Sequence, residues 1–387
     1  MDNRKMVCYY LGEKRQNRSG SDGRLVMNAH RTGRKTVNNG APTLGDGGQP
    51  MKTMKGVDGR DLKARSVFSH NGFAYELVPE YGSFPDGFEY TMYSGGCCDD
   101  QDNLYLFSRD ADRPIVVLDA QGRYVRDFGK GLFREVHSLC MTPDRTLLCT
   151  DTALHVVREL SLQGELIRDF GTLGVPSDSG YEKDVWRRMM REGKIVATDL
   201  AFDKGWSFWM SIQTIKRAAP PFNRPTGVSV GPKGDIFVSD GYGNAAIHRF
   251  APDGTLLRTW GGPGDEPGKF YVPHSICVDR LNRVWVGDRE ANSLHVFSED
   301  GEVLGYMNRN LYQPTALWTD GVYMYVAERG GGLTLIDMEM EVVAQLGFYN
   351  SPIRAHGMCG NSKGELFLMP LSTYDRHFLM CLRPVKA

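Results

Sequence analysis

Short apolar runs separated by polar turns recur along most of the chain. From about residue 66 onward, these runs alternate with turns that contain Gly, Asn or the tetrapeptide D-x-x-G, as at Asp119–Gly122. Short strands with a turn signal every 8–12 residues or so are typical of all-β proteins. A D-x-x-G turn between two such runs is typical of a hairpin. The pattern therefore predicts an all-β domain.

The apolar runs group into a longer repeat. Each unit reads strand, polar turn, strand, D-x-x-G hairpin, strand and a Phe-Gly or Trp-Gly exit. Units begin near residues 95, 136, 225, 273, 314 and 355, and the last four starts are 48, 41 and 41 residues apart. A period of about 40–45 residues is expected of four-stranded propeller blades. Six such units predict a six-bladed β-propeller.

Three stretches depart from the repeat. Residues 1–65 are poor in aliphatic residues and rich in Gly, Asn, Lys and Arg, so we expect a basic, loosely ordered extension before a propeller that spans 66–387. The excess at 174–221, with a helical stretch at 181–191, predicts a lid over the central mouth, or alternatively a hidden seventh blade. The last unit is short of strands, so we expect Phe73–Val78 to supply its outer strand.

Composition narrows the class of protein. A formal net charge of −1 argues against nucleic acid or an acidic membrane surface as the partner. The sequence has no run of about 18 apolar residues for a spanning helix, and its first residues lack the apolar stretch of a secretory signal. The eight cysteines show no CxxC spacing. We expect buried free thiols in a cytoplasmic protein, with the vicinal Cys97–Cys98 pair as a redox alternative.

Histidine occupies the same repeat position in three of the six units. His137 stands in V-H-S-L, His274 in P-H-S-I and His356 in A-H-G-M, on blades two, four and six, and the blades between carry Thr226 and Thr315 there. Because alternate blades of a six-fold ring are related by about 120°, we expect the imidazoles to converge on the channel axis. Three neutral imidazoles with an open fourth position are the ligand set of a catalytic zinc. The alternative is that each histidine is a hydrogen-bonded channel residue.

A second repeat position, at the end of the second strand, carries Arg109, Tyr242 and Arg289. The chain emerges beside the channel at this point. We therefore take these three residues as candidate active-site groups, with surface packing as the alternative for each alone.

Several strings resemble a known family. The segments 225–244 (PTGVSV…IFVSDGYGN) and 270–290 (FYVPHSI…VGDRE) resemble the NHL-repeat β-propellers, and more narrowly peptidyl-α-hydroxyglycine α-amidating lyase. The segment 137–160 resembles that lyase's H-x-L-x-x-D-x-x-x-x-x-x-T-D-x-A-L-H motif, and Leu106–Arg109 resembles the segment that holds its active-site arginine. The resemblance covers about residues 95–370.

The resemblance implies roles for the candidate residues. His137, His274 and His356 would be zinc ligands and Tyr242 the general base, while Arg109 and Arg289 would hold the substrate's carboxylate. The implied reaction cleaves the N–C bond of an α-hydroxylated amide, a carbinolamide, into an amide and an aldehyde such as glyoxylate.

The chain also departs from the family. Gly357 stands where the family has an Asp that helps bind a structural calcium, so the resemblance does not support that calcium here. Arg354 and Ala355 replace a Met-Pro pair, and Gly243 stands where the family has a disulfide cysteine. We therefore expect a cytoplasmic zinc lyase for a small carboxylate-bearing substrate that need not be a peptide. The alternatives are a metal-dependent hydrolase or lactonase on the same site, and a non-enzymatic NHL propeller that binds a partner on its face.

Overall fold

Strands form where the apolar runs are bounded by turns that reverse the chain. In β18 (Val284–Asp288) all five residues are buried, and a short turn leads to the next strand, which begins at Ser293. The D-x-x-G turn at Asp119 closes through a 2.8 Å hydrogen bond from the Gly122 N–H to the Asp119 carbonyl. Gly122 has φ of 79° there, a left-handed conformation that side chains disfavour. Local chemistry thus sets the length of each strand.

The computed structural model describes residues 54–55, 61–62, 66–89, 91–195, 204–347, 351–370 and 379–385. Residues 51–387 form one compact unit, and the description below concerns this unit. Most of the extension expected over residues 1–65 lies outside the described residues. The part of this extension that the structure describes is the pair of strands β1 (Met54–Lys55) and β2 (Asp61–Leu62).

Six antiparallel sheets make up the rest of the strands. Blades one and two contain β5 (Tyr93–Cys98), β6 (Leu104–Ser108), β7 (Ile115–Leu118), β8 (Tyr124–Phe128), β9 (Val136–Met141), β10 (Thr146–Asp151), β11 (Val156–Ser161) and β12 (Leu166–Phe170). Blades three and four contain β13 (Gly227–Val230), β14 (Ile236–Asp240), β15 (Ala246–Phe250), β16 (Leu256–Gly261), β17 (Pro273–Val278), β18, β19 (Ser293–Phe297) and β20 (Val303–Met307). Blades five and six contain β21 (Pro314–Thr319), β22 (Met324–Glu328), β23 (Leu333–Ile336), β24 (Val342–Leu346), β25 (Gly357–Gly360), β26 (Leu366–Met369), β27 (Met380–Pro384), β4 (Phe73–Val78) and β3 (Val67–His70).

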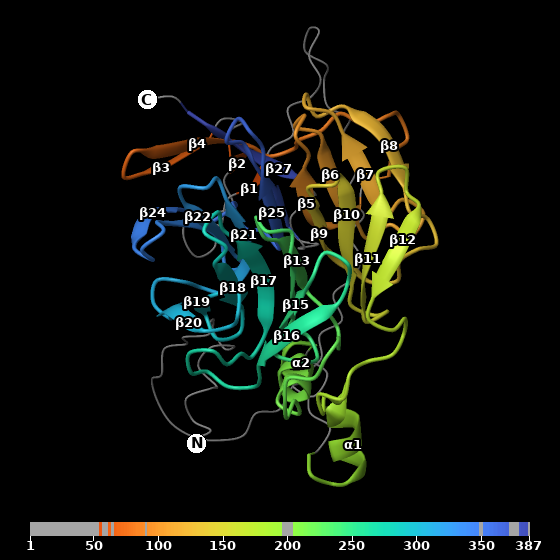
Figure 1. The fold of residues 1–387 in the computed structure, drawn as a ribbon. Coiled ribbons are helices and arrows are strands. Elements are labelled where there is room, and N and C mark those ends of the chain that lie inside the picture. The colour runs from red at the N-terminus through yellow and green to blue at the C-terminus, as the bar shows by residue number, and fades with distance from the viewer. Residues whose placement is uncertain are drawn as a thin grey trace, which may run out of the picture. The chain divides into compact units, whose positions relative to one another are not determined.

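The first strand of each blade faces the centre of the ring. These innermost strands, β5, β9, β13, β17, β21 and β25, contact one another in that order, and β25 contacts β5 again. The blades follow one another around the centre in Figure 1, and apolar clusters fill the spaces between neighbouring blades. The prediction of an all-β six-bladed propeller is confirmed.

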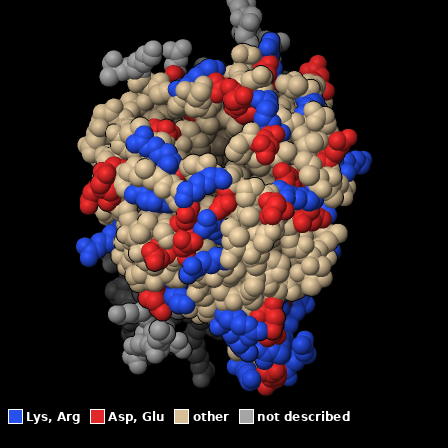
Figure 2. Space-filling model, in the orientation of Figure 1, with Lys and Arg blue, Asp and Glu red and all other residues tan. Residues whose placement is uncertain are grey.

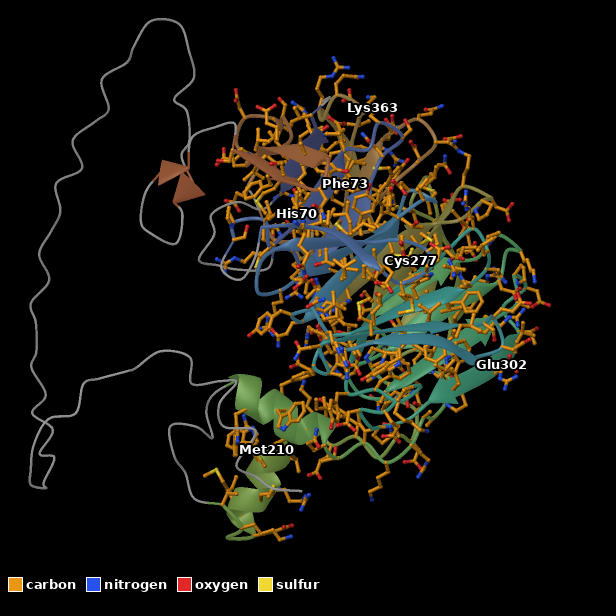
Figure 3. All side chains as sticks on the ribbon, turned by 90° about the vertical axis from the view of Figure 1, so that its left-hand side faces the viewer. His70, Phe73, Met210, Cys277, Glu302 and Lys363 are labelled. Atoms are coloured by element: carbon orange, nitrogen blue, oxygen red, sulfur yellow. The ribbon has the colours of Figure 1, made fainter. Side chains whose placement is uncertain are left out.

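The ring is closed by a strand from the start of the unit. β4 pairs with β27 and places Leu77 opposite Leu382, and both side chains lie in one buried cluster with Leu335 of blade five. The outer strand predicted at Phe73–Val78 is therefore confirmed. The sequence did not predict β3, which pairs with β4 and makes blade six five-stranded. Figure 3 shows Phe73 among these strands, where its ring contacts Tyr323 edge-on at 5.1 Å.

The insertion after blade two carries two helices, α1 (Val185–Arg191) and α2 (Lys204–Ile212). Ile212 of α2 is buried, and Phe208 and Trp209 pack against the cluster that holds Phe270 and Val272. Figure 3 places Met210 on this helix. α2 is therefore attached to blades three and four through apolar contacts.

The surface shows mixed charge. In Figure 2, acidic and basic side chains are interspersed over the blades around a central hollow, and basic side chains gather at the lower edge, where Figure 1 shows α1. Among the described residues, no helix is long and apolar enough to cross a membrane.

Candidate metal centre and active site

Three histidines from alternate blades meet at the channel axis. His137, His274 and His356 form a nearly equilateral triangle, with ring centroids 4.7–4.8 Å apart. One ligand atom from each lies within 4.8 Å of the others. The positions expected from the repeat are thus brought together, because blades two, four and six surround one axis. No other group of three or more histidine, cysteine or acidic residues in the described part of the chain is placed to hold a metal ion.

Each imidazole is oriented by the next blade. Nδ1 of His137 contacts the carbonyl of Thr226, Nδ1 of His274 lies 2.8 Å from that of Thr315, and Nδ1 of His356 lies 2.9 Å from that of Ser94. A carbonyl only accepts, so each neutral ring carries its proton on Nδ1 and leaves a lone pair on Nε2. Second-sphere bonds of this kind are what fix metal-binding histidines. The backbone carbonyls of the residues that alternate with histidine in the repeat serve this purpose.

The three Nε2 lone pairs have too few hydrogen-bond donors to satisfy them. The Tyr242 hydroxyl lies 2.9 Å from His137 Nε2 and 3.0 Å from His274 Nε2, yet its single proton can satisfy only one of them. His356 Nε2 is buried and has no hydrogen-bond partner among the described residues. A buried acceptor without a partner is unfavourable, and a cation would satisfy all three lone pairs at once. The donor set therefore fits a divalent metal such as zinc.

The surroundings keep the three rings neutral. Burial lowers the pKa of His356, the bond to Ser94 opposes this shift, and the charges of Arg109, Arg289 and Arg329 add to it, so that the pKa is about 3. The pKa values of His137 and His274 are also well below the usual range, chiefly because of burial. Neutral imidazole is the form that binds a metal.

Tyr242 joins the histidines to an arginine. Nη1 of Arg289 donates to the Tyr242 oxygen at 3.1 Å, and Nε of Arg289 donates to the Glu290 carboxylate at 2.8 Å. Burial acts to lower the pKa of Arg289, but the charges and hydrogen bonds of Tyr242 and Glu290 outweigh it and raise the pKa above the usual value. The guanidinium is therefore a fixed positive charge beside the phenol.

One repeat position supplies most of the side chains at this mouth. In four blades the residue after the second strand donates its backbone N–H to the carbonyl of the residue just before the first strand, and these residues are Arg109, Thr152, Arg289 and Arg329. In blade three Tyr242 lies one residue further from its strand, and its N–H bonds the Arg224 carbonyl. The structure thus places the candidates Arg109 and Arg289 at equivalent positions and Tyr242 one residue further along its turn. Arg329 was missed, although its place in V-A-E-R-G, at the repeat position of Arg109 and Arg289, could have revealed it.

Phe208 of the insertion covers the tyrosine. Its ring meets Tyr242 edge-on with centroids 5.6 Å apart, and the Arg289 guanidinium lies 5.5 Å from the Phe208 centroid. Sequence analysis missed this residue, because no periodic pattern links α2 to the blades. The contact makes the insertion part of the site.

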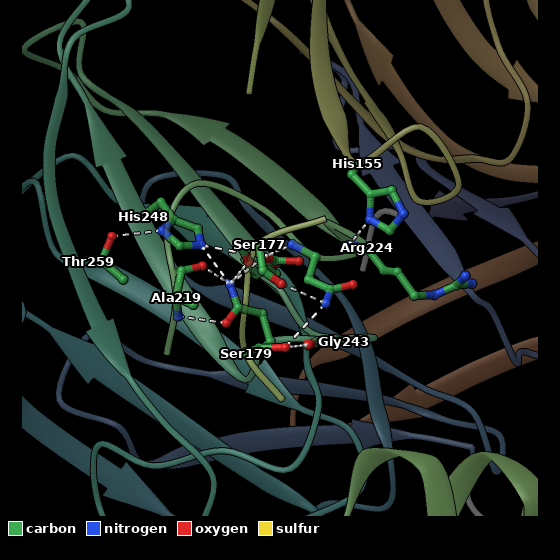
Figure 4. A network of polar contacts seen from close by, with 12 residues as sticks. His155, Ser177, Ser179, Ala219, Arg224, Gly243, His248 and Thr259 are labelled. Carbon is green, nitrogen blue, oxygen red and sulfur yellow. Dashed lines mark hydrogen bonds and ion pairs between the residues drawn. The ribbon is translucent and has the colours of Figure 1, made fainter. Parts of the chain in front are cut away.

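A buried polar network fixes the chain next to Tyr242 (Figure 4). Asn244 accepts the Ala219 N–H at 2.8 Å and donates to the Asp240 carboxylate at 2.7 Å. Ser179 donates to the Gly243 carbonyl. Both ends of the insertion are therefore tied to the turn that carries the tyrosine.

Below the histidines the innermost strands enclose a cavity of about 250 Å³ lined in part by cysteine. The seven described cysteines are free. Burial raises the pKa of Cys140 to about 11 and that of Cys277 to about 12, and it raises the pKa of Cys97 well above its usual value. These thiols stay protonated at neutral pH, which makes them poor nucleophiles. The redox alternative for Cys97–Cys98 gains no support from this environment.

The NHL-repeat family model matches residues 222–250 and 270–297, which carry parts of blades three and four. The molecule is thus a six-bladed β-propeller with NHL repeats. Among curated relatives, peptidyl-glycine alpha-amidating monooxygenase of Mus musculus is 29% identical over 249 residues, which cover 62% of this chain and 20% of the mouse protein. A Caenorhabditis elegans protein named probable peptidyl-alpha-hydroxyglycine alpha-amidating lyase is 26% identical over 48% of this chain and 43% of its own length. Human NHL repeat-containing protein 3 is 36% identical over 28% of this chain and 33% of its length.

The matched region spans about a fifth of the length of the mouse and rat relatives. Among solved structures, a streptogramin B lyase has a TM-score of 0.51 at 15% identity and covers 84% of this chain and 100% of its own. A gluconolactonase from Xanthomonas campestris has a TM-score of 0.52 at 13% identity, with coverage of 87% and 99%. These two structures share the propeller fold.

Proposed function

We propose that this protein is a zinc-dependent carbon–nitrogen lyase that cleaves a carbinolamide into an amide and an aldehyde such as glyoxylate. The observation that carries the proposal is the position of one tyrosine hydroxyl, within 3.1 Å of His137, His274 and Arg289. Relatives named as amidating lyases support the reaction class. The donor set of the three histidines supports a metal.

The reaction moves one proton and breaks one bond. Tyr242 Oη, in its phenolate form, accepts the proton of the carbinol hydroxyl as a C=O bond forms and the C–N bond breaks. The nitrogen leaves with the bonding electron pair and takes the proton back, so that no water is consumed. Zinc bound by His137, His274 and His356 would supply Lewis-acid catalysis. Arg289, which already contacts the phenol, stabilises negative charge on its oxygen during this transfer.

Arg109 is the group we assign to the substrate's carboxylate. It is exposed, and among the described residues its guanidinium has no side-chain partner. The adjacent Asp110 is bound to Arg113 at 2.8 Å. Arg109 is therefore available for a bidentate bond to a carboxylate. Phe208 covers the Tyr242 ring and excludes water from that side of the substrate site.

The test uses N-benzoyl-α-hydroxyglycine with zinc-loaded protein. We expect benzamide and glyoxylate, about one zinc per chain, and a loss of roughly 100-fold or more in kcat for Tyr242→Phe with the zinc retained. Tyr306→Phe is the matched control, because its hydroxyl bonds the Asp265 carbonyl instead. An unchanged rate in Tyr242→Phe refutes the role of the tyrosine. Benzoate as the product would indicate a hydrolase, and absence of both metal and turnover would indicate a binding module.

A further inference from the structure

The mouth of the channel carries more positive charge than one carboxylate can neutralise. Arg109, Arg289 and Arg329 hold equivalent positions on blades one, four and five, each fixed by a backbone hydrogen bond to the carbonyl before its first strand. Blade six, which carries His356, lies between blades five and one in the ring. Arg329 and Arg109 therefore stand on the two blades that flank His356.

The three arginines differ in how their charge is balanced. Arg289 is buried and paired with Glu290. Arg109 and Arg329 are exposed, and in the described part of the chain neither guanidinium has a side-chain hydrogen bond or ion pair. Arg224, the other arginine beside Tyr242, is paired with Glu135 at 3.2 Å. Two unneutralised positive charges thus remain at the mouth.

Backbone hydrogen bonds, rather than contacts of its side chain, fix the position of Arg329. Its turn is closed by hydrogen bonds between Glu328 and Gly332 and between Gly331 and Glu328. The Glu328 carboxylate accepts the Tyr312 N–H and the Thr334 hydroxyl, so it is directed away from the arginine. The next residue in the chain is Gly330, where blade four has Glu290. The acidic partner that neutralises Arg289 is therefore lacking for Arg329.

Contacts link Arg329 to the reaction site. Its backbone N–H bonds the Gln313 carbonyl at 3.0 Å, and the Gln313 amide approaches Glu290 at 3.4 Å. Glu290 holds Arg289, which holds Tyr242. We propose that Arg329 binds a second anionic group of the substrate, so that the site selects a small dianion, such as a carbinolamide with one carboxylate on each side of the C–N bond.

This inference rests on the proposed function only for the place of the first carboxylate, and binding can test it without turnover. The probes are 4-carboxyhippurate, a dianion without the reactive hydroxyl, and its 4-carbamoyl analogue, which has the same shape and one charge less. Calorimetric titration of the zinc-loaded full chain should give a Kd about tenfold lower for the dianion. Arg329→Gln should remove this preference with little effect on the monoanion, and Arg329→Lys should restore part of it. Arg123→Gln, an exposed arginine on the β7–β8 hairpin paired with Asp119, should change neither Kd.

Equal binding of the two probes by the unmodified protein overturns the inference, as does a preference that survives Arg329→Gln. Charge selection by Arg329 in a protein that does not cleave carbinolamides would refute the proposed function alone. Cleavage without charge selection would refute the inference alone.

Discussion

The ring of Phe208 meets the ring of Tyr242 edge-on, at an interplanar angle of 86° and a centroid distance of 5.6 Å. Phe208 belongs to α2, in the insertion after blade two, whereas Tyr242 follows the second strand of blade three. An aromatic contact thus joins a segment outside the repeat to the proposed base. We propose that the insertion acts as a lid by this contact.

Phe208→Ala should impair catalysis more than metal binding. Removing the ring admits water beside Tyr242 and Arg289 and leaves the phenol without its edge-on support. We expect kcat to fall about tenfold with the zinc content unchanged. Trp209→Ala is the control on the same helix, because that ring contacts Tyr271 instead. Equal losses of kcat in the two variants would mean that α2 supports folding rather than the site.

His274→Ala should abolish stoichiometric zinc binding. Two imidazoles and open solvent positions hold zinc far less tightly than three converging ligands. Elemental analysis after dialysis should give well under one zinc per chain, against about one for the unmodified protein and for His155→Gln, whose ring lies outside the triangle and accepts the Arg224 N–H. Because metal binding stabilises the folded state, a chelator should lower the Tm of the unmodified protein and leave that of His274→Ala unchanged. A full complement of zinc in His274→Ala would contradict the assignment.

The stability of the zinc-free protein should fall in mild acid because of a histidine outside the site. Burial lowers the pKa of His295, which is 1% exposed, from 6.5 to about 4. Between these two values the unfolded chain binds a proton that the folded chain excludes, so the contribution is fully present above pH 6.5 and declines as the pH falls toward 4. At pH 5 the loss is about 2 kcal/mol.

Urea unfolding of the chelated protein at pH 7.5 and 5.0 measures this effect. His295→Gln should lose about 2 kcal/mol less than the unmodified chain between the two pH values. His70→Gln, at an exposed position on β3, should lose as much as the unmodified chain. Parallel losses in all three proteins would show that His295 does not contribute.

Leu77→Ala should weaken the closure of the ring. Leu77 is 3% exposed and packs with Leu382 and Leu335 between blades five and six, and a large-to-small change at such a site costs about 2–5 kcal/mol. Val67 on β3 is 54% exposed, so Val67→Ala should change the free energy of unfolding by less than about 0.5 kcal/mol. Urea unfolding of both variants is the measurement. Similar values for the two would mean that β4 adds little to closure.

The sequence alone determined the repeat and, through it, the fold. Strand lengths follow from apolar runs and turn residues that act within a few positions of each other, and histidine on three alternate units was enough to predict a triangle. The strand at Phe73–Val78 could also be assigned, because the last unit lacked a partner for its outer edge. In each case the signal lies in local chemistry or in symmetry.

Only the tertiary structure decided how the site is completed. The contact of the Tyr242 hydroxyl with two imidazoles depends on the backbone geometry of two turns and on the bulges in the first strands. The approach of Phe208 to Tyr242 depends on the packing of a helix that lies outside the repeat. In the described part of the chain Arg329 has no acidic partner because the neighbouring Glu328 carboxylate is hydrogen-bonded to Thr334. These are relations between side chains far apart in sequence, and no local pattern records them.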